Sequence, residues 1–236
     1  LTLMVPVMLQ FMLAVRDPEV HDASSLRWVM SGAAPVAKTL IEQYNDLGIE
    51  IHQVYGLTET GGPGCLISSA DAIKRAGSTG KSFYFTQVRV INEAGADVGV
   101  DESGEVLIKG PNVMVGYWNR AEATEEALVD GWLHTGDALR QDEDGYFYVV
   151  DRIKDIYISG GENVSPAEIE NVLGGHPLVG DVAVIGVPNE EFGEEVKAVV
   201  QPVDMGDAGP ELERELIAFC QTQLAKLKCP RSIDFE

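Results

Sequence analysis

The chain has 236 residues, of which 38 are acidic and 17 basic, so its net charge is −21 at pH 7. A field of that sign repels phosphate backbones and anionic lipid, which argues against a nucleic-acid partner. Mean hydropathy is −0.01 and the hydrophobic content is an ordinary 45%. The apolar run at residues 1–15 contains Pro6 and Gln10 and is shorter than the roughly 18 residues of a membrane-spanning helix, so it predicts a buried helix in a globular protein.

The three cysteines, Cys65, Cys220 and Cys229, are widely spaced and form no metal-binding or paired pattern. Such usage indicates reduced thiols and a cytoplasmic protein. The chain begins with leucine, and its first apolar run has neither the basic start nor the cleavage site of a signal peptide. We therefore expect that an N-terminal segment precedes it.

The first part of the chain alternates between buried strands and an amphipathic helix. The pattern predicts strands at 26–32 and 49–56 and, between them, a helix at 35–46 that opens with a proline. A strand, helix and strand in this order form parallel strands, whose following loops lie at one edge of the sheet. We expect the loops at 31–35 and 55–60 to be neighbours.

The middle of the chain, from about Ser82 to Arg152, has a different sequence pattern. Short alternating strands are separated by turn sequences such as "NEAGAD" and "DEDG", which predict an antiparallel sheet. One helix, predicted at 121–128, interrupts it.

The last part begins with strong helix-start signals. Ser165 is the predicted N-cap, Pro166 occupies the first helical position, and Glu168 completes a capping box. Val164 and Ile169 are placed to form a hydrophobic staple. The remainder is predicted to form two strands and a helix, at 181–188, 195–203 and 211–227.

These patterns predict a fold in three regions. The expected fold class is α/β over residues 1–80, a β-barrel-like antiparallel region over 81–153, and a smaller α+β domain over 154–236.

Several short segments have both a chemical and an ordinary structural explanation. Residues 54–62, "VYGLTETGG", combine an aromatic ring, hydroxyls, a carboxylate and glycines, but strand-ending loops share that composition. Asp137 is expected in a tight turn opening a strand, where it could accept hydrogen bonds from a ribose or form an Asx turn. Arg152 could reach the same sugar or make a surface salt bridge. The glycines of 31–35 and 159–164 permit close approach to a ligand or a simple turn.

Six segments follow one another in a characteristic order: "SGAAP", "VYGLTE", "GEVLIKGPNVMVGYW", "GWLHTGD", "DRIKDIYISGGENVSPAEIE" and "CPRSIDF". This order and spacing resemble the adenylate-forming acyl-CoA synthetase superfamily over essentially the whole chain, and the connecting text is most similar to bacterial fatty-acyl-CoA ligases. The "SGGEN" form is typical of CoA ligases, whereas amino-acid-adenylating domains differ there. Luciferase-like relatives share much of the pattern, so an oxidative function stays open.

The resemblance implies an ATP- and Mg²⁺-dependent site. It assigns Tyr55 to the wall of the adenine pocket, Thr58 to the α-phosphate and Glu59 to Mg²⁺, which makes Thr58 and Glu59 the catalytic pair. Asp137 and Arg152 are assigned to the ribose. The full set implied for binding ATP or AMP is Gly32, Ala33, Ala34, Pro35, Tyr55, Gly56, Thr58, Asp137 and Arg152.

The resemblance also implies a second half-reaction, in which the small domain turns at the hinge Lys154 and coenzyme A displaces AMP from the acyl-adenylate. The residues implied for coenzyme A are Ser159, Gly160, Gly161 and Glu162. The implied acyl pocket consists of Met30, Gly56, Leu57 and Gly61. The resemblance favours a medium- to long-chain fatty acid. The small side chains of the pocket leave room for a long chain, but an aryl acid fits them as well and is the alternative.

Two departures from the family pattern bear on activity. The phosphate loop rich in serine, threonine and glycine, and the lysine that closes the family's sequence, are both missing from these 236 residues. We expect a chain truncated at both ends that adenylates acids poorly by itself, because the groups that would stabilise the phosphates are lacking. A non-catalytic, nucleotide-binding fragment is therefore the alternative to an enzyme. No feature of the sequence indicates the oligomeric state or membrane docking.

Overall fold

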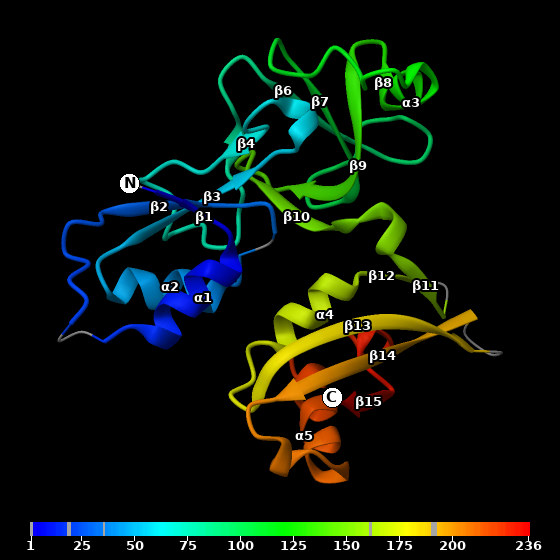
Figure 1. Cartoon of the computed structure of the whole chain (residues 1–236). Helices are drawn as coiled ribbons and strands as arrows, with labels where there is room; N and C mark the ends of the chain where they lie inside the picture. Colours follow the sequence, from blue (N-terminus) through cyan, green and yellow to red (C-terminus); the bar gives the residue numbers. More distant parts are fainter. Residues whose placement is uncertain (1, 18–19, 35, 161, 190–192) are drawn as a thin grey trace. The chain divides into compact units, whose positions relative to one another are not determined.

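A computed structural model describes residues 2–17, 20–34, 36–160, 162–189 and 193–236. The chain divides into two compact units, residues 1–149 and 150–236 (Figure 1). The expected boundary, between residues 153 and 154, lies four residues after the observed division between residues 149 and 150. It falls within the single 3-10 turn η2 (Ile153–Asp155).

The first unit begins with a five-stranded sheet in the order β1-β2-β3-β4-β5. Its first three strands are parallel, and Ser31 of β2 lies beside Gln53 of β3. Figure 1 shows both helices on the same side of this sheet, where their apolar residues form one core with Val29 and Ile51. The predicted strand, helix and strand are confirmed. The elements are β1 (Thr2–Met4), α1 (Pro6–Val15), β2 (Trp28–Ser31), α2 (Lys38–Asp46), β3 (Glu50–Tyr55), β4 (Cys65–Leu66) and β5 (Lys81–Ser82).

The prediction of one buried helix over residues 1–15 was wrong. A strand precedes Pro6, which starts α1 because proline has a fixed φ and no N–H to lose at the first helical position. Leu9 is the buried residue of α1, whereas Phe11 and Val15 are 66% and 70% exposed. The proline expected to open the second helix is residue 35, outside the described residues, and α2 begins at Lys38. Among the described helices, none has the length and apolar character needed to cross a membrane.

The second sheet of this unit is antiparallel, in the order β10-β9-β7-β6, with β8 beside β9. Val106, Ile108, Leu139 and Phe147 form its core with Tyr55 of the first sheet. The helix expected at 121–128 is present one residue shorter. The elements are β6 (Gln87–Ile91), β7 (Ser103–Lys109), α3 (Ala121–Ala127), β8 (Leu128–Val129), β9 (Trp132–Gln141) and β10 (Phe147–Arg152).

The second unit contains a sheet in the order β12-β11-β14-β13, with β15 parallel to β14. Ile169 and Leu173 of one helix and Leu212 and Leu216 of the other are buried in a common core with the strands. The helix predicted at 211–227 ends at Gln221, where the Thr222 hydroxyl binds the Phe219 carbonyl and competes with the helical hydrogen bond. The elements are β11 (Tyr157–Ser159), β12 (Glu162–Val164), α4 (Pro166–Leu173), β13 (Val179–Asn189), β14 (Gly193–Pro202), η3 (Met205–Asp207), α5 (Pro210–Gln221), η4 (Lys226–Lys228) and β15 (Ser232–Phe235).

The start of α4 confirms the predicted N-cap and corrects the capping box. The Ser165 hydroxyl accepts from the Glu168 amide at 3.3 Å and donates to Asp151 Oδ2 at 2.7 Å. That carboxylate oxygen also accepts from the Ala167 amide at 3.1 Å. The Glu168 carboxylate does not close the box but pairs with Lys228 Nζ at 2.7 Å, because a cation offers it a stronger partner than a backbone amide.

Replacing Ser165 by alanine is expected to lower the free energy of unfolding of the second unit by about 1–2 kcal/mol, because the helix loses an N-cap acceptor. Urea denaturation followed by circular dichroism measures this change. Ser25→Ala, at an exposed serine, is the control and should leave the midpoint unchanged. Equal midpoints for Ser165→Ala and the wild type would contradict the cap.

Candidate active site

The loop after β3 is a single 3-10 turn, η1 (Thr58–Thr60), organised by a buried threonine. Thr60 Oγ1 accepts from the Leu57 amide at 2.9 Å and lies 2.6 Å from the Gly62 carbonyl oxygen, to which it donates. Gly61 closes the turn with φ +58°, and a Cβ there would lie 2.7 Å from the Asn112 carbonyl oxygen. The turn thereby leaves Thr58 exposed and Glu59 half-exposed.

A second loop, residues 110–118, holds this turn from the side. The Met114 amide donates to the Glu59 carbonyl at 2.7 Å, and the Asn112 side chain donates to the Thr60 carbonyl at 2.8 Å. The Tyr117 hydroxyl donates to Glu59 Oε1 at 2.8 Å. Sequence reasoning assigned no role to Asn112 or Tyr117, although both lie in a segment that carried the family resemblance.

Two residues that were predicted to bind the nucleotide, 82 positions apart in the chain, contact each other in the first unit. The Tyr55 hydroxyl donates to Asp137 Oδ2 at 2.8 Å. Tyr55 is 8% exposed. Burial, and then the negative charge of Asp137, raises the pKa of Tyr55 far above its usual value, so the hydroxyl remains a donor. The Asp137 amide donates to Thr135 Oγ1 at 3.1 Å, and Thr135 Oγ1 donates to the Val106 carbonyl at 2.8 Å.

The setting of Asp137 differs from the prediction. Asp137 does not open a strand but lies inside β9, where the register with β7 shifts between Glu105 and Leu107. Gly136, with φ +70°, supplies the conformation that such a bulge requires. A bulge redirects a side chain within a strand, which explains how Asp137 turns toward Tyr55.

The segment after β2 lies against β3, as expected for neighbouring loops. A Cβ at Gly32 would lie 2.4 Å from the Val54 carbonyl oxygen, so only glycine allows this approach. Ala33 has φ +67°, and both Ala33 and Ala34 are exposed. Pro35 lies outside the described residues.

The residues predicted for the acyl pocket lie on the same two strands or just beyond them. Met30 is half-buried on β2 beside His52 of β3. A Cβ at Gly56 would lie 2.5 Å from the Gly62 carbonyl oxygen. Leu57 and Gly61 flank the 3-10 turn. Their contact with an acyl group remains a prediction.

The remaining predicted residues belong to the second unit or its first strand. Arg152 is the last residue of β10, and Lys154 lies in η2. Ser159 is buried and pairs with Glu162 across the hairpin of β11 and β12, with Gly160 at φ +58°. Gly161 lies outside the described residues. The ribose, hinge and coenzyme A roles of these residues remain predictions.

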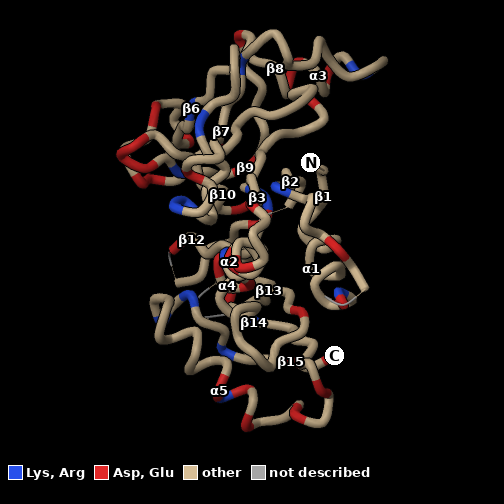
Figure 2. The backbone as a smooth tube through the Cα atoms, turned by 90° about the vertical axis from the view of Figure 1, so that its left-hand side faces the viewer, with Lys and Arg blue, Asp and Glu red and all other residues tan. Residues whose placement is uncertain are grey.

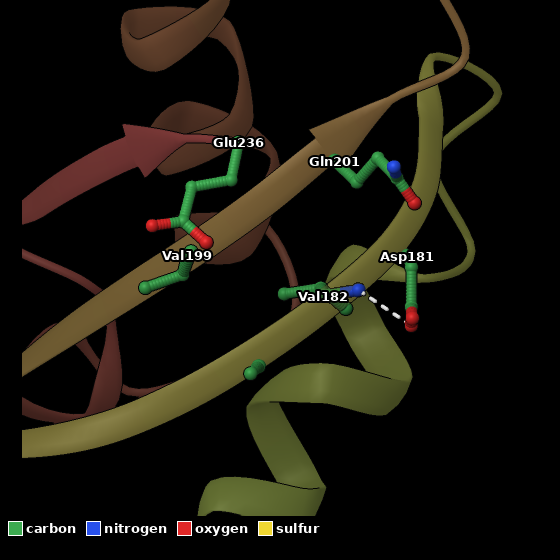
Figure 3. Close-up of a pocket in the computed structure, with 6 residues that line it drawn as sticks. Asp181, Val182, Val199, Gln201 and Glu236 are labelled. Atoms are coloured by element: carbon green, nitrogen blue, oxygen red, sulfur yellow. Dashed lines mark hydrogen bonds between the residues drawn. The ribbon is translucent and has the colours of Figure 1, made fainter.

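Two hollows lie in the surface of the described residues, one in the second unit and one beside the loop 110–118 of the first unit. One lies over β13 and β14 of the second unit, where the Asp181 carboxylate accepts from the Val182 amide at 2.9 Å (Figure 3). None of the predicted site residues lines it. A second hollow, of about 380 Å³, is lined by residues 115–119, with Ala121, Thr124 and Glu125.

The charge around the site shapes how it can bind anions and cations. Acidic residues occur along both units and outnumber the basic residues (Figure 2). Because the overall negative charge repels a phosphate group, hydrogen-bond donors close to that group would have to hold it.

No cluster of three or more metal-ligating side chains occurs among the described residues. Glu59 nevertheless offers Oε2, which has no hydrogen-bond or ion-pair partner among the described residues. Mg²⁺ favours one or two carboxylates together with substrate phosphates, so this donor fits Mg²⁺.

Family models and solved structures place this mixed α/β fold among the adenylate-forming enzymes. Residues 1–118 match the model of the AMP-binding enzyme family, and residues 168–235 match its C-terminal domain. The chain belongs to the AMP-binding enzyme family. The resemblance predicted from the ordered motifs is thereby confirmed.

Curated relatives and solved structures agree with this membership. A feruloyl-CoA synthase of Amycolatopsis is 47% identical over 233 residues, 98% of this chain and 46% of the relative. The long-chain-fatty-acid–CoA ligase FadD13 of Mycobacterium tuberculosis is 43% identical over 231 residues, 98% of this chain and 45% of the relative. The o-succinylbenzoate CoA synthetase MenE of Bacillus subtilis, in complex with an acyl-adenylate, matches with a TM-score of 0.89 and 33% identity over 99% of this chain and 46% of that one. The chain thus spans about half the length of these relatives.

Proposed function

We propose that the protein is an AMP-forming acid:CoA ligase. In the first step the acid carboxylate attacks the α-phosphorus of ATP, which forms an acyl-adenylate and releases pyrophosphate. In the second step the coenzyme A thiol attacks the acyl carbon and displaces AMP, which forms the thioester. The observation that carries the proposal is the turn at Thr58–Thr60 in a chain whose relatives include several CoA ligases.

The residues of the chain would share the first step between them. The exposed Thr58 hydroxyl would donate to an α-phosphate oxygen, and Asp137 would accept from the ribose hydroxyls. Glu59 would hold Mg²⁺ through Oε2. When bound, Mg²⁺ offsets the repulsion between the two anionic substrates and the charge that develops as pyrophosphate leaves. MenE has been solved in complex with ATP and magnesium ion, which supports these cofactors.

We propose a medium- to long-chain fatty acid as the substrate, with an aryl acid as the second candidate. The match to FadD13 supports the first and the match to a feruloyl-CoA synthase supports the second. The glycines around the turn leave space for either kind of chain.

The domain roles follow the same proposal. Residues 1–153 would be the C-terminal part of the large AMP-binding domain, with the barrel-like form of its antiparallel region, and residues 154–236 would be the small domain that turns at Lys154. The separate family matches to residues 1–118 and 168–235 support this division. A cytoplasmic location is supported by Cys65, Cys220 and Cys229, which are all free and buried.

The test is an acid panel with ATP, Mg²⁺ and coenzyme A, applied to the protein purified from its own host. Acids of several chain lengths are compared with ferulate and benzoate, and the thioester is detected by mass spectrometry beside the pyrophosphate released. We expect thioester and pyrophosphate in equal amounts for one class of acid. Release of pyrophosphate with no thioester would contradict coenzyme A as the acceptor, and neither product with any acid would contradict the ligase.

A further inference from the structure

The Glu59 carboxylate is held by a residue to which the proposed chemistry assigns no part. Tyr117 donates its hydroxyl to Oε1 at 2.8 Å, while Oε2 has no partner among the described residues. We propose that Tyr117 is a positioning residue for Glu59, fixing one carboxylate oxygen so that the other is presented to a divalent cation. The inference rests on the proposed function for the identity of the reaction, but the contact can be tested without it.

Tyr117 is itself anchored on the side away from Glu59. Its amide donates to Thr124 Oγ1 at 2.9 Å, and that hydroxyl donates to the Arg120 carbonyl at 2.8 Å at the start of α3. Gly116 permits this approach, because a Cβ there would lie 2.8 Å from Thr124 Cγ2 and its φ is +150°. A series of contacts therefore runs from α3 through Tyr117 to the carboxylate.

The backbone around the carboxylate is held from the same loop. The hydrogen bonds from the Met114 amide and the Asn112 side chain fix the carbonyl oxygens of Glu59 and Thr60. With the backbone held, the remaining freedom of Glu59 lies in its side chain, and the Tyr117 hydroxyl restricts that freedom.

The side chain of Tyr117 is less exposed than those of Val115 and Trp118 beside it in the loop. Val115 and Trp118 are 101% and 90% exposed, whereas Tyr117 is 38% exposed. The hydrogen bond to Glu59 is the main cause that raises the pKa of Tyr117, so its hydroxyl stays a proton donor through neutral pH. A phenylalanine at this position would fill the same space without restraining Oε1.

The first experiment compares Tyr117→Phe with the wild type in the ATP-dependent activation of the acid that the panel identifies. We expect the half-saturating Mg²⁺ concentration to rise about tenfold and kcat to fall, with KM for the acid unchanged, because outer partners of metal ligands have effects of that size. Tyr84→Phe is the matched control, since Tyr84 is 79% exposed in the same unit. Unchanged Mg²⁺ dependence together with a lower thermal midpoint in Tyr117→Phe would mean a purely structural tyrosine and would overturn the inference.

The second experiment tests the inference without any reaction. Binding of Mn²⁺ in the presence of a non-hydrolysable ATP analogue is followed by electron paramagnetic resonance in the wild type, in Tyr117→Phe and in the Tyr84→Phe control. We expect the dissociation constant for Mn²⁺ to rise about tenfold in Tyr117→Phe and to stay unchanged in the control. Equal dissociation constants in Tyr117→Phe and the wild type would overturn the inference. If the wild type binds Mn²⁺ in this way but forms no acyl-adenylate, the proposed function fails alone.

Discussion

We expect Glu59→Gln to lower the rate of the proposed acyl-adenylate formation by about 10²- to 10³-fold, the size expected when one preorganised electrostatic contact at the reacting phosphates is removed. The amide keeps the shape of the side chain and an oxygen that can accept from Tyr117, which lies 2.8 Å from Glu59 Oε1. What it loses is the negative charge that a hard divalent cation requires. Pyrophosphate release, measured over a range of Mg²⁺ concentrations in the native protein, reports the loss.

The matched control for this variant is Glu122→Gln, which removes the same charge from an exposed position on α3. Both variants should unfold at the wild-type temperature, and the control should keep the wild-type rate. A Glu59→Gln protein with normal pyrophosphate release would show that this carboxylate does not hold the metal.

Asp137→Ala is the second variant with a large expected effect, because its carboxylate accepts the Tyr55 hydrogen bond and is also proposed to bind the ribose. Tyr55 is 8% exposed and would lose its acceptor at 2.8 Å, so the free energy of unfolding should fall by about 1–3 kcal/mol. Loss of the ribose acceptor should also weaken AMP binding by roughly 10- to 100-fold. Urea denaturation and isothermal titration calorimetry with AMP measure the two effects separately.

Tyr55→Phe separates these tasks, because it keeps the Asp137 carboxylate and removes the hydroxyl. It should cost about 1 kcal/mol of stability and leave most of the ribose contact. The variant with both substitutions should lose less stability than the two single variants together, since each substitution removes the same hydrogen bond between Tyr55 and Asp137. If Asp137→Ala is less stable but binds AMP like the wild type, the carboxylate is structural and its assignment to the ribose fails.

The elements that sequence reasoning predicted well are those with strong local signals. Ser165 before Pro166 predicts the start of α4, because capping depends on residues within one helical turn. The strand, helix and strand around α2 predicted that the loops at 31–35 and 55–60 would be neighbours, since parallel strands place their following loops at one edge. The structure brings Gly32 of the first loop against Val54, just before the second. The helix predicted over residues 1–15 failed because hydrophobicity alone does not tell a strand followed by an exposed helix from one buried helix.

By itself, the sequence determined the strand, helix and strand around α2, the start of α4, the family and the choice of Thr58, Glu59 and Asp137 as candidate site residues, because these depend on short segments and their spacing. The tertiary structure alone decided which distant side chains meet. Tyr55 meets Asp137 across 82 residues, and Tyr117 meets Glu59 across 58. Such pairs depend on strand register, a bulge and the path of a loop, which arise from the packing of the whole unit and leave no local pattern in the chain.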